Sequence, residues 1–247
     1  NPYNFVTGNP IMAIDPDGDT TFVQEISNNI YQVDYVETRS GDKSVFAVSY
    51  DENGNRVLGA RIGKTLSTHS FVAPGGRSMR GAIIDLNSRE GEEWLKSIYN
   101  QRIDPFKYFQ NAGYFQKYDY KTKGMDPEYY QKVEDKEGKI SINFKPEYAY
   151  AANSYVYRGS MLGNSIVSAR DIGNIGAGIQ ASRGGLPKSM MRLGFDAYEA
   201  MNTGGIFSGG TVEPFGSAYP QNRGSDIHFF MSSLNGDWDR VLRILNI

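Results

Sequence analysis

Apolar and polar side chains alternate with a period of two along the first third of the chain. Residues 30–37 and 44–50 are rich in β-branched and aromatic residues that alternate with polar ones, which is typical of strands with one buried face. A tight Asn-Gly turn then precedes a returning strand at residues 56–62. We therefore predict three or four short strands in a small antiparallel sheet over residues 20–84, one that needs a partner surface for stability.

From residue 85 onward the apolar spacing changes to three and four residues, the period of a helix. Trp94 and Ile98 fall one turn apart after a cap-like start at residues 87–90. Asp104 and Asp126 each stand before a proline, the order of an N-cap followed by the first helical residue. Each of these places predicts the start of a helix.

The remaining segments are predicted from the same signals. Further helices are expected at residues 165–183, 187–201, 225–234 and 237–245. Residues 117–145 are charged and tyrosine-rich, and we expect surface helix and loop there. Residues 203–217 hold five glycines and predict a long loop, of the kind that is usually functional or mobile.

The change of period near residue 85 sets the predicted architecture. We predict an α+β fold, in which a small antiparallel β-sheet is followed by a mainly α-helical domain. The predicted division is a turn-rich segment at residues 1–19, the sheet region at residues 20–84 and the helical domain at residues 85–247.

Composition narrows the class of protein. Of the 247 residues, 39% are hydrophobic and 13% aromatic, which is enough to build a core and argues against a disordered chain. The 26 basic residues nearly balance the 28 acidic ones. The net charge of −2 therefore gives no overall field that would recruit nucleic acid or an anionic membrane, and a nuclease would need a local basic patch.

Residue types that commonly bind metals are scarce. The chain has no cysteine, and its two histidines are His69 and His228. Disulfides, thiolate metal sites, cysteine nucleophiles and multi-histidine metal centres are therefore not expected, and we predict neither a metal nor a cofactor. Apolar runs stay well short of the roughly 20 residues that a spanning helix needs, so no transmembrane segment is predicted.

Residues 3–19 form a distinctive motif, YNFVTGNP followed after three residues by IDPDGD. Its turn formers flank a short apolar run, and in any β protein they would describe a turn, a strand and a turn. The order and length of the motif also resemble the junction that closes the core of RHS/YD-repeat proteins. That resemblance implies that residues 1–19 end an upstream RHS shell and that the rest is a variable C-terminal effector, secreted or delivered at the cell surface as part of a larger protein.

Asp15 lies within the D-P-x-G part of this motif. The resemblance implies a role in self-cleavage, because RHS cores of this family can cut themselves near the motif with a pair of aspartates, one of which Asp15 matches. Its partner is expected upstream. Since such a pair needs one protonated and one ionised carboxyl, this chain alone is not expected to cleave itself, and a turn residue is the default role for Asp15.

Three later segments resemble, in order and wording, the polymorphic toxin type 44 module. They are YDYK at residues 118–121, ARDIGNIGAG at residues 169–178 and AYPQNRGSDIH at residues 218–228. Tyr118 stands where the family usually has tryptophan, residues 124–163 look like an insertion, and the last segment lacks the family's second acid and proline. The resemblance implies a toxin, and leaves its target open.

Asp171 and Asn174 are candidates for a substrate site. They are three residues apart on a predicted helix and therefore share a face. A carboxylate beside an amide, with Gly178 leaving room for backbone, would position a sugar or phosphate or hold a water. The alternative is structural: Asp171 caps the helix or pairs with Arg170 or Arg192, and Asn174 ties two helices together.

His228 is the candidate proton shuttle at neutral pH, with Asp226 close to it in the sequence. The alternative is a helix-start aspartate and a histidine that faces solvent. Asp119 and Lys121 are candidates for binding an anionic group, and a solvated charged surface is the alternative for both. Arg192 completes the substrate-binding candidates, although an intrahelical ion pair is its simplest interpretation.

These observations lead to two alternative functions. The favoured one is the C-terminal toxin of an RHS-repeat protein used in competition between bacteria, with a cognate immunity protein as partner and an unknown macromolecule of the target cell as substrate. The expected activity is a hydrolase of cell wall or nucleic acid, in which Asp171 and Asn174 position the substrate and His228 with Asp226 transfers protons. The alternative is a non-enzymatic tip that binds carbohydrate or protein.

Overall fold

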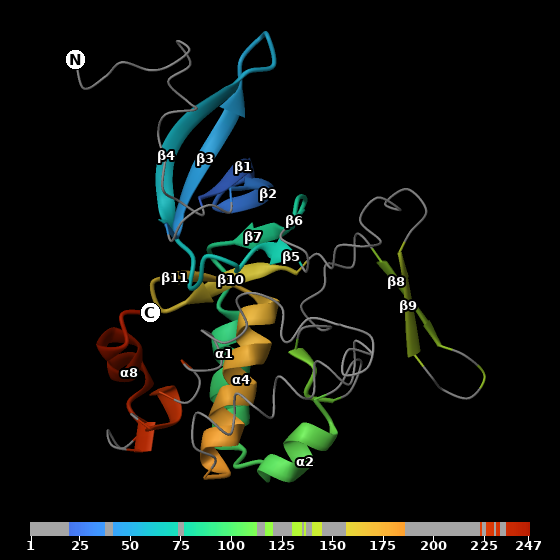
Figure 1. Cartoon of the computed structure of the whole chain (residues 1–247), viewed down its shortest axis with the longest axis vertical. Coiled ribbons are helices and arrows are strands. Elements are labelled where there is room, and N and C mark those ends of the chain that lie inside the picture. The colour runs from blue at the N-terminus through green and yellow to red at the C-terminus, as the bar shows by residue number, and fades with distance from the viewer. Residues whose placement is uncertain are drawn as a thin grey trace, which may run out of the picture.

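The computed structural model of the chain is shown in Figure 1. It describes residues 20–37, 42–73, 77–112, 117–120, 130–134, 136, 140–144, 157–185, 223, 226–229, 231–232 and 236–247. Several predicted features lie outside these residues: the motif at 1–19 with Asp15, Lys121, the helix start at Asp126, the helix at 187–201 with Arg192, and the loop at 203–217.

A seven-stranded mixed sheet organises the described part of the chain (Figure 1). Its strands, in order across the sheet, are β11 (Ser165–Ser168), β10 (Gly159–Leu162), β7 (Ile83–Asp85), β2 (Ile30–Val36), β1 (Thr21–Ser27), β3 (Ser44–Tyr50) and β4 (Arg56–Lys64). Neighbouring strands are antiparallel, except that β1 and β3 are parallel and β7 and β10 are parallel. The first four strands of the chain include the two that the alternating pattern predicted, β2 and β3, and the returning strand predicted after the Asn-Gly turn, β4.

The predicted fold class is nevertheless wrong. The sheet is neither small nor wholly antiparallel, and β10 and β11 come from the part of the chain that was predicted to be mainly helical. The reason for the error is burial, because all four residues of β11 are buried and the strand has no polar face to produce an alternation. The parallel pairs also need crossover connections, which no local pattern encodes.

The two edges of the sheet meet. Thr65, directly after β4, forms a parallel bridge with Ile166 of β11. The backbone N–H of Leu66 then donates to the Ile166 carbonyl over 2.9 Å. The sheet therefore coils until its first and last strands touch, which covers part of each edge.

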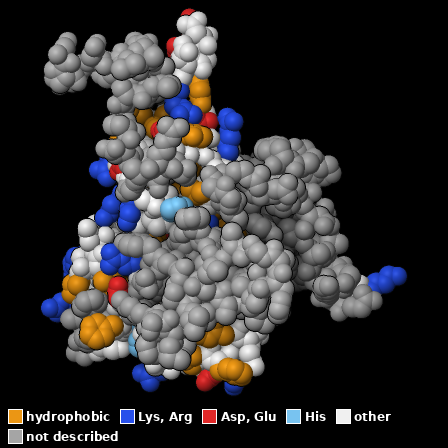
Figure 2. All heavy atoms as spheres, viewed as in Figure 1, with side chains coloured by type: hydrophobic (Ala, Val, Ile, Leu, Met, Phe, Trp, Pro, Cys, Tyr) orange, Lys and Arg blue, Asp and Glu red, His pale blue; other side chains and the backbone are white. Residues whose placement is uncertain are grey.

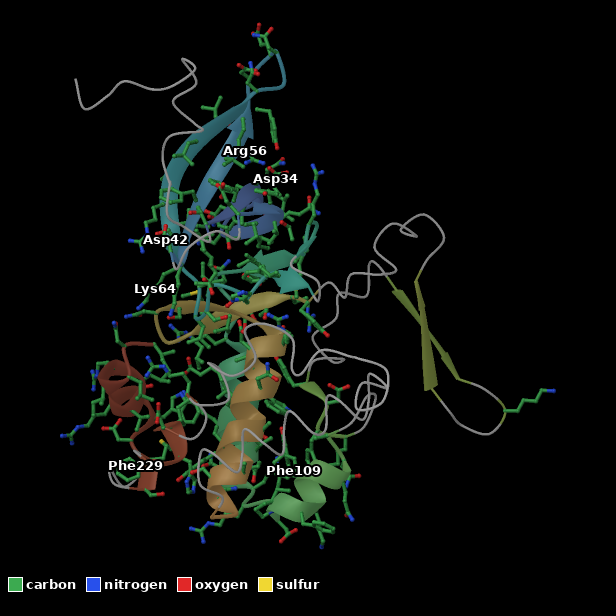
Figure 3. The ribbon with its side chains drawn as sticks, viewed as in Figure 1. Asp34, Asp42, Arg56, Lys64, Phe109 and Phe229 are labelled. Carbon is green, nitrogen blue, oxygen red and sulfur yellow. The ribbon has the colours of Figure 1, made fainter. Side chains whose placement is uncertain are left out.

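A β-bulge in β2 places an acidic residue inside the molecule. Val33 and Tyr35 pair with consecutive residues of β1, so Asp34 between them is the extra residue. The bulge turns Asp34 inward, where it is 5% exposed. Its carboxylate accepts hydrogen bonds from Arg56 at 3.0 Å and from Arg80 at 3.3 Å. Figure 3 labels Asp34 and Arg56 in the upper part of the molecule.

Four helices have described bounds: α1 (Glu90–Asn100), α2 (Pro105–Gln110), α4 (Ala169–Arg183) and α8 (Trp238–Ile244). The predicted helix start at Asp104 is confirmed, because its side chain accepts from the Lys107 N–H at 2.9 Å. The start of α4 lies four residues later than predicted, since β11 occupies residues 165–168. Surface helix and loop were predicted at 117–145, where the structure instead has the hairpin β8 (Tyr130–Glu134) and β9 (Ile140–Phe144).

Helices α1 and α4 lie side by side below the sheet (Figure 1). Close contact depends on small residues at two points. A Cβ on Gly91 of α1 would lie 2.6 Å from Ile172 of α4, and a Cβ on Gly176 of α4 would lie 2.8 Å from the Trp94 ring. At each of these points the backbone of one helix packs against a side chain of the other. Helix α4 also carries Asp171 and Asn174 and contacts His228.

Glu92 joins α1 to the turn between β10 and β11. Its side chain is 4% exposed and accepts from Lys96 at 2.7 Å, Arg89 at 2.9 Å and the Gly163 backbone N–H at 3.0 Å. Burial would raise the pKa of this carboxyl, but these hydrogen bonds and charges outweigh burial and hold the pKa below its ordinary value. Among the described helices, each is too short or too polar to span a bilayer.

Candidate functional site

Asp171 is placed by the junction between β11 and α4. Its carboxylate Oδ2 accepts from the backbone N–H of Ser168 at 3.0 Å and from the Ser168 hydroxyl at 3.1 Å. The Asp171 N–H in turn faces the Ser168 hydroxyl at 3.3 Å. The two residues form a reciprocal capping box at the start of α4, so the capping alternative describes the contacts that Asp171 makes.

The Asp171 carboxyl is fully buried, and burial raises its pKa. The Arg170 charge and the hydroxyls of Ser70 and Ser168 act in the opposite direction without cancelling the effect of burial. Ser70 is a weak donor here, because its own hydroxyl donates to the Ser67 carbonyl at 3.0 Å. Oδ1 of Asp171 therefore has no hydrogen bond of ordinary geometry within the described part of the chain.

Asn174 lies one turn further along α4 and is 3% exposed. Within the described residues its Nδ2 is a buried donor without a partner. Within the described residues, Asp171 and Asn174 thus bring to the same side of the helix a carboxylate oxygen that receives at most a weak bond from Ser70 and an amide donor without a partner. Such a pair would hold a water or a hydroxyl group that accepts from one and donates to the other.

His228 meets the opposite end of α4. Its Nδ1 lies 3.1 Å from the hydroxyl oxygen of Ser182, in the last turn of the helix. The imidazole lies beside the Tyr99 ring of α1, with 6.3 Å between ring centroids. Ser182 and His228 are 46 residues apart in the sequence, so packing alone brings this hydroxyl and imidazole together.

Arg183 adds a positive charge to this group. Its Nη2 donates to the Tyr99 carbonyl at 2.6 Å, and its guanidinium lies 4.8 Å from the Tyr99 ring centroid. Its Nη1 is buried and has no hydrogen-bond acceptor in the described part of the chain. Nη2 therefore caps the end of α1, and Nη1 is a second donor for which the described residues provide no acceptor.

The pKa of His228 lies below its ordinary value. Burial is the larger cause, because it disfavours the charged imidazolium, and the neighbouring Arg183 charge lowers the pKa further. His228 is therefore neutral at pH 7 and able to accept a proton. A neutral imidazole in contact with a hydroxyl, next to a fixed cation, is an arrangement that can activate a nucleophile.

The other candidate acids lie elsewhere. Asp226 pairs with Arg223 at 4.0 Å and projects from a different face of the helical segment from His228. Asp119 is 6% exposed and lies close enough to Tyr108 of α2 to raise the pKa of that phenol, in addition to the larger effect of burial. Asp119 is thus a buried residue of the α2 region rather than part of a solvated surface.

The candidate residues fall into separate groups. Asp171 and Asn174 share the first half of α4, whereas His228 contacts Ser182, eleven residues after Asp171. At 1.5 Å per residue, that separation corresponds to roughly 16 Å along the helix. Asp171 and His228 are therefore too far apart to contact the same atom of a substrate. Any chemistry of His228 uses the residues at the C-terminal end of α4.

Sequence reasoning missed Ser182, Arg183 and Tyr99. Their residue types are common, and none belongs to a recognisable motif. The one available signal was periodicity: Ser182 lies on the same helical stripe as Asp171, three turns further on. Nothing in that stripe indicates which distant segment covers it, so the pairing with His228 follows only from the tertiary structure.

Comparisons with known proteins return no match among family models, curated proteins or solved structures. Within the described residues, histidine, aspartate and glutamate side chains nowhere gather in a group of three that would hold a metal ion. The chemistry of the site therefore has to be argued from its own geometry.

Proposed function

We propose that the chain is a hydrolase and that Ser182 and His228 form its reactive centre. The observation that carries this proposal is the 3.1 Å contact between the Ser182 hydroxyl and Nδ1 of His228. Both belong to elements fixed by a buried core: Ser182 lies on α4, and Ile227, next to the histidine, is fully buried. This rigidity supports a catalytic role, because a general base has to be held within hydrogen-bond reach of the proton it removes.

In the proposed reaction the neutral imidazole of His228 takes the proton of the Ser182 hydroxyl. Oγ then forms a bond to the electrophilic carbon or phosphorus of the substrate, the bond to the leaving group breaks, and the leaving group takes the proton from His228. Water, deprotonated by the same imidazole, next attacks the serine ester and restores the Ser182 hydroxyl. Hydrolysis is thereby balanced, with one water consumed for each bond cleaved.

Arg183 supplies the charge stabilisation that this reaction needs. Within the described residues its Nη1 is a buried donor without an acceptor, and its charge adds to burial in lowering the pKa of the imidazole, so that His228 is neutral before the substrate binds. A fixed cation next to developing negative charge is a large contributor to catalysis in a water-poor site. The Tyr99 carbonyl and ring hold the guanidinium in place.

The biological setting that we propose is that of a C-terminal effector of an RHS-repeat protein. The supporting observation is the YNFVTGNP and IDPDGD motif at residues 3–19. In this setting the chain is delivered as part of a larger secreted or cell-surface protein, and a cognate immunity protein protects the producing cell. The segments that resemble the toxin type 44 module support an effector as well, and the target is either the cell wall or nucleic acid.

A second candidate function is that of a binding tip, favoured by one surface of the sheet. Tyr35 and Tyr50 are each 44% exposed beside the bulge at Asp34. The Arg56 guanidinium lies 5.5 Å from the Tyr35 ring centroid, and Arg80, on the same carboxylate, has a 75% exposed side chain. Exposed tyrosine and arginine are enriched where proteins bind other proteins, so this surface would bind a partner without catalysis.

Expression of the full chain in bacterial cytosol and, separately, in periplasm tests the hydrolase proposal. We expect growth inhibition in one compartment, and we expect His228→Ala and Ser182→Ala each to lower the toxic activity by about 10²-fold or more. His69→Gln is the matched control, because it removes the other histidine of the chain and should leave toxicity unchanged. Toxicity that persists in both site variants would favour the binding tip, and a harmless chain in both compartments would contradict the effector proposal.

A further inference from the structure

A second group of charged and aromatic side chains surrounds the bulge at Asp34. Oδ2 of Asp34 accepts from the Tyr50 hydroxyl at 2.6 Å and from Arg56 at 3.0 Å. Oδ1 accepts from Arg80, in the turn before β7, at 3.3 Å. The Arg56 guanidinium also lies 5.5 Å from the Tyr35 ring centroid. These contacts join side chains of β2, β3, β4 and the turn before β7 into one group, which we call the Asp34 cluster.

The acid and the cations of the Asp34 cluster differ in their exposure to solvent. The Asp34 side chain is 2% exposed, whereas that of Arg56 is 28% exposed and that of Arg80 is 75% exposed. The carboxylate is therefore covered, and the charge that the cluster presents to solvent is positive. The bond to Asp34 uses one of the five N–H groups of Arg80, so this guanidinium can bind a second carboxylate.

Stability alone does not account for a carboxylate inside the bulge. Replacing a buried ion pair by apolar residues is often neutral or stabilising, and bulges commonly redirect a side chain at a functional position. The buried Asp34 does provide a fixed anchor for Arg80, whose side chain lies mostly in water. An arginine that is already held loses less conformational entropy when it binds a partner.

Two exposed tyrosines flank the guanidinium groups. Tyr35 and Tyr50 are each 44% exposed. Both contact or neighbour Arg56, Tyr35 through its ring and Tyr50 as the cross-strand partner of that arginine. Figure 2 shows basic and hydrophobic side chains exposed together in the upper part of the molecule. Tyrosine and arginine are enriched among the residues that contribute most to protein interfaces, and tyrosine buries a large area at a low cost in conformational entropy.

We infer that the Asp34 cluster binds an acidic segment of a partner protein, with a carboxylate of the partner on Arg80 and neighbouring partner residues packed on Tyr35 and Tyr50. The inference rests on the surface given above as the second candidate function and names the chemistry of its partner. It does not depend on the hydrolase centre. A planar guanidinium can bind a carboxylate through two parallel hydrogen bonds, and the flanking rings exclude water from that pair.

The charge of the Asp34 cluster distinguishes between possible partners. Its two guanidinium groups and one carboxylate leave one net positive charge, which matches a single carboxylate. Nucleic acid binds through several phosphates at once, each neutralised by a cation, and this cluster has too few cations for that. A second copy of this chain in a symmetric dimer would place the cluster against itself, with Arg80 facing Arg80. An acidic protein segment is therefore the partner that fits.

Selection from a random peptide library displayed on phage, with the immobilised full chain as the target, tests the inference. The enriched peptides should be rich in aspartate and glutamate. A fluorescein-labelled copy of the most enriched peptide is then titrated with the chain by fluorescence anisotropy. Arg80→Ala and Tyr35→Ala should each weaken its binding about tenfold or more, the size of effect expected for a central interface residue. Added salt should weaken binding to the wild type, because the pair is exposed.

Arg243→Ala is the matched control, because Arg243 is an exposed arginine of α8, far from the upper strands of the sheet in Figure 1. It should leave peptide binding unchanged. His228→Ala should also leave peptide binding unchanged while it lowers toxicity in the killing assay. The two assays therefore separate a failure of the hydrolase proposal from a failure of this inference.

Enriched peptides without acidic residues, or equal effects of Arg80→Ala and Arg243→Ala, would overturn the inference. An oligothymidylate that binds more tightly than the peptide and depends on Arg80 would overturn it in favour of nucleic acid. A dimer in analytical ultracentrifugation that Arg80→Ala dissociates would overturn it in favour of a second copy. Peptides that need Tyr35 but carry no acid would keep the binding tip and exclude its acidic partner.

Discussion

The hydroxyl oxygen of Ser182 lies 3.1 Å from Nδ1 of His228, and the residue after that serine carries the charge that acts on the imidazole. The last turn of α4 thus provides both the hydrogen-bond partner of the histidine and a cation that adds to burial in lowering the pKa of the imidazole. Among the described residues, the Ser182 hydroxyl, the Tyr99 ring and the Arg183 guanidinium face the imidazole. The pKa of His228 is therefore sensitive to how Ser182 and Arg183 lie around the imidazole.

The first prediction concerns the pKa of His228. Because burial and Arg183 both disfavour the imidazolium, activity should be full near neutral pH and should fall as the pH drops through a pKa below the ordinary 6.5. Arg183→Gln removes the charge and leaves burial, so the pKa of His228 should rise part of the way back and the acid limb should move to higher pH. NMR titration of the imidazole protons measures this pKa without a substrate, and His69→Gln assigns the two histidine signals.

Arg183→Lys provides the matched control for this titration. It keeps a positive charge beside the imidazole while losing the planar fork that caps α1, so the pKa of His228 should stay near the wild-type value. A pKa that is unmoved in Arg183→Gln, or that shifts equally in both variants, would mean that helix packing rather than charge controls the histidine.

The pattern of the sequence was enough to predict the strands that have one exposed face. Residues 44–50 alternate and residues 56–62 follow an Asn-Gly turn, and the structure has β3 and β4 there, joined by a turn in which Gly54 has φ +77°. The pattern failed for the fully buried β11 and for the parallel pairs, where partners come from distant segments. It also could not show that a bulge turns Asp34 inward, because the bulge depends on the register with β1.

Part of the candidate site could likewise be predicted from the sequence, and part required the tertiary structure. A single histidine in the C-terminal half is visible in the sequence and was a candidate for that reason, whereas its contact with Ser182 requires α4 and residues 226–229 to be packed together. For Asp171 the sequence left capping and substrate binding open. The reciprocal bonds with Ser168 supply the capping contacts, and the proposal that this residue binds substrate stays a prediction.

The second prediction tests the capping role of Asp171. Asp171→Ala loses the bonds to Ser168 and should lower the free energy of unfolding by about 1–2 kcal/mol. Asp171→Asn keeps an oxygen acceptor, so its effect at pH 7 should be within about 1 kcal/mol of wild type. If substrate binding were the only role of Asp171, both variants would unfold like wild type in urea.

The stability of the wild type relative to Asp171→Asn should depend on pH, in a direction that follows from the raised pKa of Asp171. Burial raises the folded-state pKa of Asp171 above its unfolded value, so the folded state binds more protons and this group favours folding at low pH. Its contribution is lost as the pH rises through the folded-state pKa. The wild type should therefore gain stability relative to Asp171→Asn as the pH is lowered from 7 to about 4, and the opposite trend would contradict the direction of the shift.

The third prediction concerns the Asp34 bulge. The Asp34 side chain is 2% exposed and bonds to Arg56 and Arg80, whose side chains are 28% and 75% exposed. Asp34→Ala leaves a partly buried guanidinium and the Tyr50 hydroxyl, 2.6 Å from the carboxylate, without their acceptor. We expect a loss of about 2–3 kcal/mol in the free energy of unfolding, less than for a fully buried pair because solvent reaches both arginines.

Arg80→Ala is the control for this cluster. Its side chain is mostly in water, so the change should be within about 1 kcal/mol of wild type. Arg56→Ala should fall between the two, since Arg56 also lies 5.0 Å from the Phe22 ring centroid and loses that contact. Urea denaturation of the three variants gives the order, and an Arg80→Ala effect as large as that of Asp34→Ala would show that the exposed ion pair holds the bulge.

The fourth prediction separates backbone strain from steric overlap at two glycines. Gly163 and Gly54 both have positive φ, +56° and +77°, so alanine at either position is strained by about 1–2 kcal/mol. The surroundings differ: a Cβ on Gly54 meets nothing within 4 Å, whereas a Cβ on Gly163 would lie 2.5 Å from the Ile247 backbone oxygen. That oxygen accepts from the Asn164 N–H at 3.2 Å, so it cannot move away without losing this bond. Gly54→Ala should therefore cost about 1 kcal/mol and Gly163→Ala about 3 kcal/mol in the free energy of unfolding by urea denaturation, and equal costs would mean that the contact between the β10–β11 turn and Ile247 is not maintained in solution.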